Sequence, residues 1–167
     1  MPAYKLTYFD VRGLAEMSRY VFAEAGVQYE DVRIKSDDWP KLKPSTPFGK
    51  MPYLSVDGKE VAHSRAIVRF LGREFRLDGG DSLTAARLDV WIEQLFETYS
   101  SMPWTEEDED QKAKLLATWE KETLAPKLEK LGGNKCGWRS FFPWQGCFHF
   151  GFCHFANLRI YERKVEP

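Results

Sequence analysis

The sequence predicts a small α/β domain followed by an all-helical domain, and three features support this division. Short β-prone segments alternate with helical ones in the first part of the chain. A turn-rich linker, RLDGGD at 76–81, comes next. After the linker, apolar residues recur only at helical spacing. We therefore expect domains at 1–77 and 83–134, and an atypical tail at 135–167.

The composition of the chain is that of a folded protein with balanced charge. Its 167 residues carry a formal net charge of -1, and 43% are hydrophobic, which excludes global disorder. Balanced charge argues against nucleic-acid binding. No stretch approaches the roughly 20 apolar residues of a membrane helix, and the N-terminus lacks the apolar core of a secretory signal. We expect a cytoplasmic protein that binds neither nucleic acid nor membrane.

The first half of the N-terminal domain is predicted to begin with a strand–helix–strand unit. Residues 5–9 are β-prone and lead into a turn at 10–13. Apolar residues then fall at helical spacing from Leu14 to Ala25, and Gly26 follows as a stop. Residues 27–34 alternate loosely, which predicts the second strand.

The second half is predicted to hold a short helix, a hairpin and a longer helix. Residues 37–43 could form the short helix, closed by Pro44. Asp57-Gly58 is a hairpin signal between two β-prone segments at 52–56 and 60–62. Ser64 is a good N-cap for the helix that follows, which carries apolar residues at 67, 68, 71 and 75.

Two helices are convincing beyond the linker. The first has one apolar face from Leu88 to Met102 and ends at Pro103. Thr105 and the acidic residues after it are expected to open the second, which runs to the Gly132-Gly133-Asn134 stop. Pro126 is expected to kink this second helix. The helical domain is therefore an incomplete bundle.

The tail differs in composition from the preceding chain. Residues 136–167 hold nine Phe, Trp or Tyr residues and all three cysteines, namely Cys136, Cys147 and Cys153. These cysteines, with His149 and His154, lack the paired spacing of a zinc site. An altered or truncated C-terminus is the favoured interpretation. The earlier chain has no cysteine, so a Cys-x-x-Cys disulfide oxidoreductase is excluded.

Several spaced motifs resemble one family. The segments MPAYKLTYFDVRG, QYEDVRI, DWPKLKPSTPFGKMPYLSVDG and SRAIVRFL closely resemble sigma-class glutathione S-transferases, a group that includes glutathione-dependent prostaglandin D synthases and S-crystallins. The resemblance is dense to residue 77 and weaker to about residue 133, and it does not extend over 136–167. It implies a thioredoxin-like N-terminal domain that binds glutathione, a helical C-terminal domain, and an electrophile in the cleft between them.

The resemblance implies that Tyr8 is the catalytic residue. Its hydroxyl would donate a hydrogen bond to the sulfur of glutathione, which lowers the pKa of the thiol and makes a better nucleophile. The alternative for Tyr8 is a strand tyrosine packed in the core. The reaction would be conjugation of a small apolar electrophile, or isomerisation of a prostaglandin endoperoxide.

Further residues are expected to hold glutathione as co-substrate. Pro52 opens a strand, which is unusual unless its peptide bond is cis, although an ordinary turn proline is the alternative. Ser64 lies at a helix N-terminus, which favours the γ-glutamyl carboxylate. A lysine and an indole N–H are expected near the glycyl carboxylate. The complete expected set is Trp39, Lys43, Gly49, Lys50, Met51, Pro52, His63 and Ser64.

The electrophile pocket is expected beside Phe9, Tyr99, Met102 and Trp104. A homodimer is expected if the helical domain folds. No metal is expected, because Phe96 interrupts the acidic pair Glu93 and Glu97 and cannot ligate.

Three departures from the family pattern leave a second hypothesis open. Leu14 stands where the prostaglandin synthases carry an arginine, Phe96 stands within the acidic cluster that can bind a divalent cation in those synthases, and the later helices of the family are missing after Gly133. His63 also stands where the family normally has a glutamine. The alternative is a catalytically weak or inactive, crystallin-like structural protein, or a truncated isoform.

Overall fold

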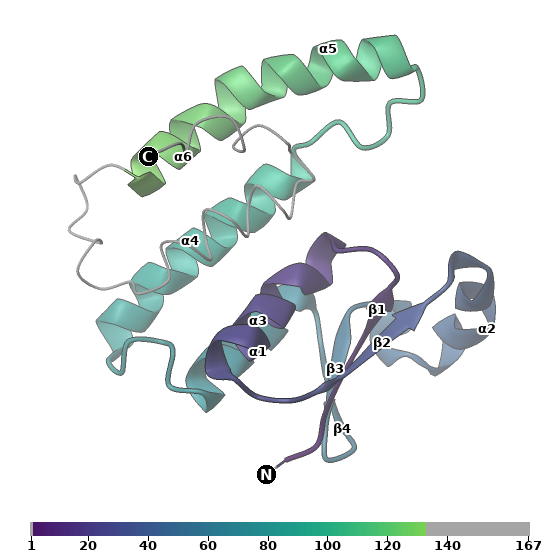
Figure 1. Cartoon of the computed structure of the whole chain (residues 1–167), viewed down its shortest axis with the longest axis vertical. Coiled ribbons are helices and arrows are strands. Elements are labelled where there is room, and N and C mark those ends of the chain that lie inside the picture. The colour runs from purple at the N-terminus through teal and green to yellow at the C-terminus, as the bar shows by residue number, and fades with distance from the viewer. Residues whose placement is uncertain (1, 133–167) are drawn as a thin grey trace.

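A computed structural model describes residues 2–132. It consists of a four-stranded sheet with flanking helices, followed by a second, all-helical part (Figure 1). In Figure 1, α1 and α3 lie together on one side of the sheet and the short α2 lies on the other. The strands are β1 (Tyr4–Phe9), β2 (Glu30–Ile34), β3 (Tyr53–Val56) and β4 (Lys59–Ala62). The α-helices are α1 (Glu16–Ala25), α2 (Trp39–Leu42), α3 (Ser64–Glu74), α4 (Ser82–Ser100), α5 (Glu109–Trp119) and α6 (Ala125–Gly132).

The sheet has the order β2-β1-β3-β4, so β1 is bonded on both edges. It runs parallel to β2 and antiparallel to β3. The pairing with β3 ends at Thr7, whereas the pairing with β2 continues through Tyr8 to Phe9. The last two residues of β1 therefore extend beyond the β3 pairing.

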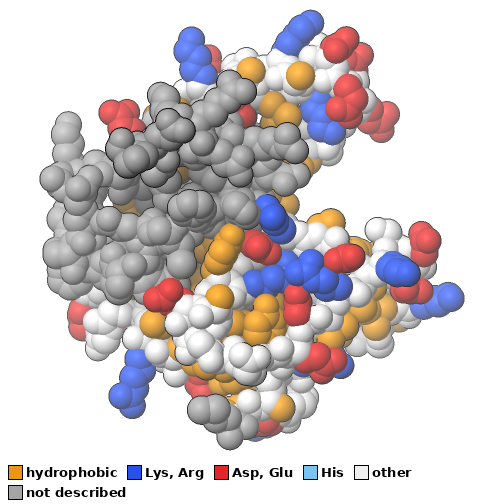
Figure 2. All heavy atoms as spheres, in the orientation of Figure 1, with side chains coloured by type: hydrophobic (Ala, Val, Ile, Leu, Met, Phe, Trp, Pro, Cys, Tyr) orange, Lys and Arg blue, Asp and Glu red, His pale blue; other side chains and the backbone are white. Residues whose placement is uncertain are grey.

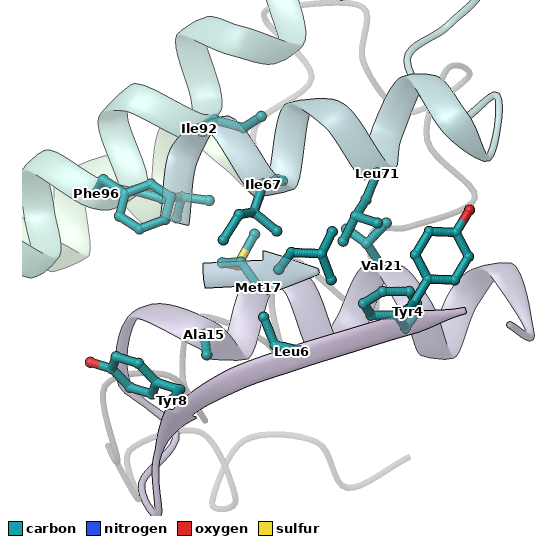
Figure 3. Packing of buried hydrophobic residues seen from close by; sticks show 14 of the residues in the cluster. Tyr4, Leu6, Tyr8, Ala15, Met17, Val21, Ile67, Leu71, Ile92 and Phe96 are labelled. Carbon is teal, nitrogen blue, oxygen red and sulfur yellow. The ribbon is translucent and has the colours of Figure 1, made fainter. Parts of the chain in front are cut away.

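The core lies between the sheet and the helices α1, α3 and α4 (Figure 3). Leu6 and Leu54 from the sheet are fully buried, as are Ile67 and Leu71 from α3. Figure 3 shows the hydroxyls of Tyr4 and Tyr8 at opposite ends of β1, each pointing away from the apolar cluster between them. Burial of this cluster is the main favourable contribution to folding of the N-terminal part.

The predicted order of elements in the first domain is confirmed, and the largest displacement of a boundary is at the second strand. The second strand begins at Glu30 and not at residue 27. Gly26 adopts a left-handed conformation after α1, and the N–H of Val27 donates to the carbonyl of Phe22. Val27 thus belongs to the C-terminal cap of α1, because its N–H bonds to a carbonyl of the helix and not to a neighbouring strand.

Two predicted helix caps are wrong. The N-cap of α3 is His63, at φ 68°, while Ser64 is the first helical residue. The N-cap of α5 is Asp108, not Thr105, and its carboxylate accepts a 2.8 Å hydrogen bond from the N–H of Gln111. Asp108 stands three residues before Gln111, which is the spacing that a side-chain cap requires.

Two prolines act differently from the simplest expectation. Pro44 lies inside a 3-10 turn at Lys43–Ser45 and does not close the short helix, because proline is tolerated in a first helical turn. The kink expected at Pro126 takes the form of a π-helical turn at Glu120–Leu124, between α5 and α6. Pro126 has no N–H to continue the regular ladder, so an irregular turn before it has a direct cause.

In the helical part, residues of the predicted apolar faces are buried. Ile92, Leu95 and Phe96 of α4 are buried, as is Trp119, whose indole N–H donates to the hydroxyl of Ser101. Among the helices described, none is long and apolar enough to cross a lipid bilayer. The predicted tail at 135–167, and the Gly133-Asn134 part of the predicted helix stop, lie outside the described residues.

Candidate functional site

Tyr8 lies at the open end of the sheet and is only 7% exposed. Its hydroxyl accepts a 3.3 Å hydrogen bond from the backbone N–H of Leu14, in the segment that joins β1 to α1. Its ring meets Phe9 edge to face, with the ring centroids 5.6 Å apart. The phenol oxygen keeps its own proton free to donate, because here it acts as an acceptor.

Burial raises the pKa of the Tyr8 phenol above its ordinary value, while the hydrogen bond from Leu14 and the charge of Arg19 lower it. The net direction is upward, so Tyr8 is a neutral O–H group at neutral pH. A buried, protonated phenol is a suitable hydrogen-bond donor to an anion. These properties suit a neutral hydrogen-bond donor in an active site.

Gly13 is the residue against which the Tyr8 ring packs. Its φ is +42°, and a Cβ at this position would lie 2.9 Å from both Cε1 and the hydroxyl oxygen of Tyr8. Such a distance is below normal van der Waals contact, so any side chain here displaces the phenol. Gly13 therefore lets the loop and the phenol approach each other.

We expect Gly13→Ala to displace Tyr8 and to lower the free energy of unfolding by about 1–2 kcal/mol from the left-handed backbone, with a further loss from the clash. Urea denaturation measures the stability, and ultraviolet titration of the phenol reports its surroundings. The matched control is Gly26→Ala, since Gly26 has φ +64° but an open space around its Cβ position. A Tyr8 titration shifted equally in both variants contradicts the expected role of Gly13.

The predicted glutathione-holding residues are found on the segment between α2 and β3 and at the start of α3. The Met51–Pro52 peptide bond is cis, as the sequence predicted. Pro52 is buried, whereas the side chains of Lys43 and Lys50 are exposed. Lys43 lies over Gly49, because a Cβ on Gly49 would be 3.6 Å from Cε of Lys43. The structure thus places one expected cation directly beside the turn that precedes Pro52.

His63 and Ser64 lie close to the same turn. The His63 ring lies 5.6 Å from the ring of Phe48, which follows Pro47 in that turn. Ser64 is 9% exposed and opens α3. Although it is not the N-cap, Ser64 still lies where the free N–H groups of a helix favour an anion. His63 is exposed, so its imidazole is accessible.

Trp39 is brought to the site from the other face of the sheet. Its ring meets that of Phe9 edge to face, at 5.5 Å between centroids. Phe9 in turn meets Tyr8. Phe9 therefore links the tryptophan of α2 with the phenol, so that Trp39 belongs to the same cluster as Tyr8.

The remaining predicted pocket residues come from the helical part. Tyr99 packs on Trp104 with the ring centroids 4.7 Å apart, and the indole N–H of Trp104 donates to the Tyr99 carbonyl at 2.8 Å. Met102 is partly buried against the core. Burial raises the pKa of Tyr99 to about 12, and the phenol of Tyr8 adds to this rise. That coupling places the two phenols within electrostatic reach of each other.

Tyr8 is thus the residue shared by two groups of predicted site residues. One group lies on the sheet domain and includes Phe9 and Trp39, and the other lies at the C-terminal end of α4 and includes Tyr99 and Trp104. Figure 2 shows the molecular surface hollowed between the sheet domain and the helical part. A polar ligand on the domain and an apolar ligand beside Tyr99 could meet at the Tyr8 hydroxyl.

The acidic residues of α4 have basic partners. Arg69 of α3 pairs with Asp89 and Glu93, Arg65 pairs with Glu93, and Lys127 pairs with Glu97. Over residues 2–132, no cluster of three or more potential metal ligands occurs. The acidic positions considered in the sequence therefore form ion pairs in this fold.

Three contributors to the site were missed by sequence reasoning. The N–H of Leu14 contacts the Tyr8 hydroxyl, Gly13 provides the space for it, and Arg19 is buried nearby. The Arg12-Gly13 pair in a turn is a signal that could have indicated Gly13. Arg19 gives no such signal, because an arginine between the apolar positions of a helix ordinarily faces solvent.

Comparison with known proteins adds independent information. The family model described as "Glutathione S-transferase, N-terminal domain" matches residues 4–73. The chain is 43% identical over 138 residues to "Glutathione S-transferase 1" of Ascaris suum, covering 78% of this chain and 67% of that protein. It is 40% identical over 157 residues to "Hematopoietic prostaglandin D synthase" of Homo sapiens, covering 88% and 78%. A solved "prostaglandin synthase D" of Nilaparvata lugens superposes with a TM-score of 0.79 at 32% identity, covering 93% of this chain and 82% of that one.

The similarity to these relatives extends further along the chain than the sequence motifs indicated. A match that covers 88% of the chain necessarily runs past residue 135, so similarity to these proteins extends into the segment that the sequence analysis set apart. The chain spans 57% of a second curated relative, the "Hematopoietic prostaglandin D synthase" of Gallus gallus. The three curated relatives named here are thus covered over 57% to 78% of their length.

Proposed function

This chain belongs to the glutathione S-transferase family, and from that premise we propose that it activates the thiol of glutathione for attack on a small apolar electrophile. The second form of the same chemistry is the isomerisation of a prostaglandin endoperoxide with glutathione as cofactor, which the similarity to the prostaglandin D synthases supports. Both reactions need a glutathione thiolate held next to an apolar pocket.

The observation that carries this proposal is the state of Tyr8. Its phenol is buried, protonated at neutral pH and held at the end of β1 by Leu14. A hydrogen bond from this phenol to the glutathione sulfur favours the charged form of the sulfur and lowers the pKa of the thiol. The thiolate is the nucleophile, so its fraction at neutral pH sets the rate of attack.

We propose that the residues around Pro52 hold the tripeptide. Lys43, Lys50 and Trp39 suit the glycyl carboxylate, since they supply two cations and an indole donor. Ser64 suits the γ-glutamyl carboxylate because it opens α3, and the exposed imidazole of His63 lies next to it. The main chain at Met51 suits the cysteinyl part. Fixing both ends of glutathione in this way sets the position of its sulfur relative to Tyr8.

The electrophile is proposed to lie beside Phe9, Tyr99, Met102 and Trp104. Three of these side chains are aromatic, and the Tyr99 phenol stays protonated up to about pH 12. Such a pocket favours a small apolar molecule over a charged one. We further propose that the protein is of sigma type, cytoplasmic and homodimeric; the similarity to the hematopoietic prostaglandin D synthases supports the first of these.

The test of glutathione binding is the thermal unfolding of the full chain with and without millimolar glutathione. A ligand that binds only the native state must raise the midpoint, and at 100 times its dissociation constant it adds about 2.7 kcal/mol. We expect a rise that is lost in the double variant Lys43→Ala and Lys50→Ala. The matched control is Lys59→Ala, because Lys59 is an exposed lysine at the start of β4. No rise with wild-type protein contradicts glutathione binding.

A second candidate function is that of a structural relative without turnover. Leu14 favours it, because this residue is partly buried against the core cluster, and an apolar side chain supplies no charge beside the Tyr8 hydroxyl. The same melting experiment, followed by an assay with an aryl halide, separates the two candidates. Stabilisation by glutathione together with conjugation supports the enzyme, whereas stabilisation without conjugation supports the structural relative.

A further inference from the structure

Arg19 is a buried cation in the middle of α1. The residue is 8% exposed, and its guanidinium reaches four other residues. Nη1 donates to the carbonyls of Val11 and Arg12 at 3.1 Å each and to the Glu16 carboxylate at 2.9 Å. Nε donates to both carboxylate oxygens of Asp31 on β2, at 3.2 Å. One side chain therefore joins the loop after β1, the helix α1 and the strand β2.

The two carbonyls that Arg19 holds belong to the loop that shapes the surroundings of Tyr8. Val11 and Arg12 immediately precede Gly13, which packs against the phenol. The next residue, Leu14, donates its N–H to the phenol oxygen. In the four consecutive residues 11–14, the first two carbonyls accept hydrogen bonds from Arg19, and the last two residues contact the phenol of Tyr8. A displacement of Val11 and Arg12 would also move Gly13 and Leu14, because each residue of the connecting backbone has only two soft torsions.

Arg19 pairs with two carboxylates, but its guanidinium is not completely hydrogen-bonded. Glu16 faces it from α1 and Asp31 from β2, while Arg33, also on β2, shares Asp31 and pairs with Asp10. Nη2 is buried, and within residues 2–132 no group accepts a hydrogen bond from it. The positive charge of Arg19 lowers the pKa of the phenols of both Tyr8 and Tyr29. A buried charge acts over a longer distance than an exposed one, because water screens it less.

We propose that Arg19 is a positioning residue for thiol activation: by holding the Val11 and Arg12 carbonyls, it fixes the loop that orients the Tyr8 hydroxyl, and its buried charge favours an anion beside that hydroxyl. The proposal rests on the proposed glutathione chemistry, and it adds a residue that never touches the substrate. A guanidinium suits this task, because its planar fork donates to several acceptors at once and it stays charged.

The first experiment compares wild type with Arg19→Lys. Lysine keeps the charge, but its single ammonium group cannot reproduce the planar fork that serves β2 and the loop together. We expect the phenol of Tyr8, titrated by ultraviolet absorbance against a Tyr8→Phe background, to ionise at higher pH. In the conjugation assay, kcat/KM is expected to fall at least roughly tenfold, a loss typical of a slightly misplaced catalytic group.

The control for the first experiment is Arg33→Gln. Arg33 shares the Asp31 carboxylate with Arg19 but is exposed, and its contacts in the described structure are to Asp31 and Asp10, not to the loop carbonyls. Its loss is expected to leave the Tyr8 titration and kcat/KM unchanged. If Arg33→Gln and Arg19→Lys change the Tyr8 titration and kcat/KM equally, these changes come from the shared Asp31 carboxylate, and the proposal is overturned.

A second variant, Glu16→Gln, is expected to shift the ionisation of the Tyr8 phenol in the opposite direction. Its result does not require that Arg19→Lys folds. Glu16→Gln keeps a hydrogen-bond acceptor for Nη1 but removes the negative charge beside it. The charge of Arg19 then acts more strongly on Tyr8, so the phenol is expected to ionise at lower pH than in wild type. Loss of the Glu16 carboxylate also acts on the phenol directly, so the double variant Glu16→Gln and Arg19→Gln is titrated beside it. We expect the downward shift to disappear in the double variant, and a shift of the same size in both overturns the proposal.

These readouts also separate this proposal from the proposed function. The phenol titrations need no glutathione, so they test the coupling of Arg19 to Tyr8 even in a chain that binds none. Wild-type protein without glutathione binding contradicts the proposed function alone. Wild-type protein that conjugates glutathione, with the Tyr8 titration unchanged in both Arg19→Lys and Glu16→Gln, contradicts the role of Arg19 alone.

Discussion

Replacing Tyr8 with phenylalanine is expected to lower kcat/KM for glutathione conjugation about 100-fold or more, with only a small change in glutathione affinity. The substitution removes one hydrogen-bond donor to the developing charge, and such a donor typically contributes that much. The ring itself remains packed against Phe9, and the lost contact to Leu14 is a long one at 3.3 Å. Stability is therefore expected to change by less than about 1 kcal/mol.

The pH dependence distinguishes a catalytic role from a structural one. With Tyr8 in place, the phenol remains protonated and favours the thiolate, so kcat/KM reaches its plateau below the ordinary pKa of a thiol. In Tyr8→Phe, the midpoint is expected to rise toward about 8.5, the value of an unperturbed thiol. Steady-state kinetics across a pH series measures this shift, and binding is measured separately by calorimetry.

The matched control is Tyr4→Phe. Tyr4 lies on the same strand and is as buried as Tyr8, but its hydroxyl donates to Glu74 at the opposite end of the sheet. This variant is expected to keep both the rate and the pH midpoint of wild type. Equal turnover in Tyr8→Phe and wild type would remove Tyr8 from the mechanism and favour the packed-tyrosine alternative.

The second large effect concerns stability. Phe22→Ala is expected to lower the free energy of unfolding of the N-terminal domain by about 3–5 kcal/mol, as large-to-small aromatic substitutions in cores do. Phe22 is completely buried and stacks on Tyr29, with the ring centroids 4.1 Å apart and the planes 13° from parallel. It also contacts Tyr4 and Phe75. Its loss removes contacts from α1, β1 and the end of α3 at once.

A loss of that size is a large fraction of the stability of an ordinary domain, which is about 5–15 kcal/mol. Urea denaturation followed by far-ultraviolet circular dichroism measures it. The control is Leu83→Ala, since Leu83 is 69% exposed and its truncation is expected to change stability by no more than about 0.5 kcal/mol. Similar losses for the two variants would show that Phe22 is not central to the core.

The sequence alone predicted the order of the elements because each one carries a local signal. Periodic apolar residues identified α1, α3 and α4, and the Asp57-Gly58 turn identified the β3–β4 hairpin. The cis bond before Pro52 was also predictable, since proline at the start of a strand is uncommon otherwise. Tyr8 was singled out through the resemblance of its surrounding motif to a family, and its role is still a prediction.

Helix starts were predicted less well, because several residues near each start are capable of capping. Ser64 and Thr105 have suitable side chains, but the chain path selects His63 and Asp108 as caps. Which residue caps a helix depends on the backbone conformation of that residue and on the direction from which the preceding loop enters the helix. For α3 that loop is fixed by the sheet and by the turn that contains Phe48, which packs on His63.

The sequence by itself determined which segments are strands and helices, since hydrophobic periodicity is a property of neighbouring residues. Only the tertiary structure decided the surroundings of Tyr8. The approach of Gly13, the bond from Leu14 and the burial of Arg19 between the loop, α1 and β2 depend on how separate segments meet. An arginine has the same identity in the sequence whether it faces solvent or holds a loop, and packing alone assigns it one of these roles.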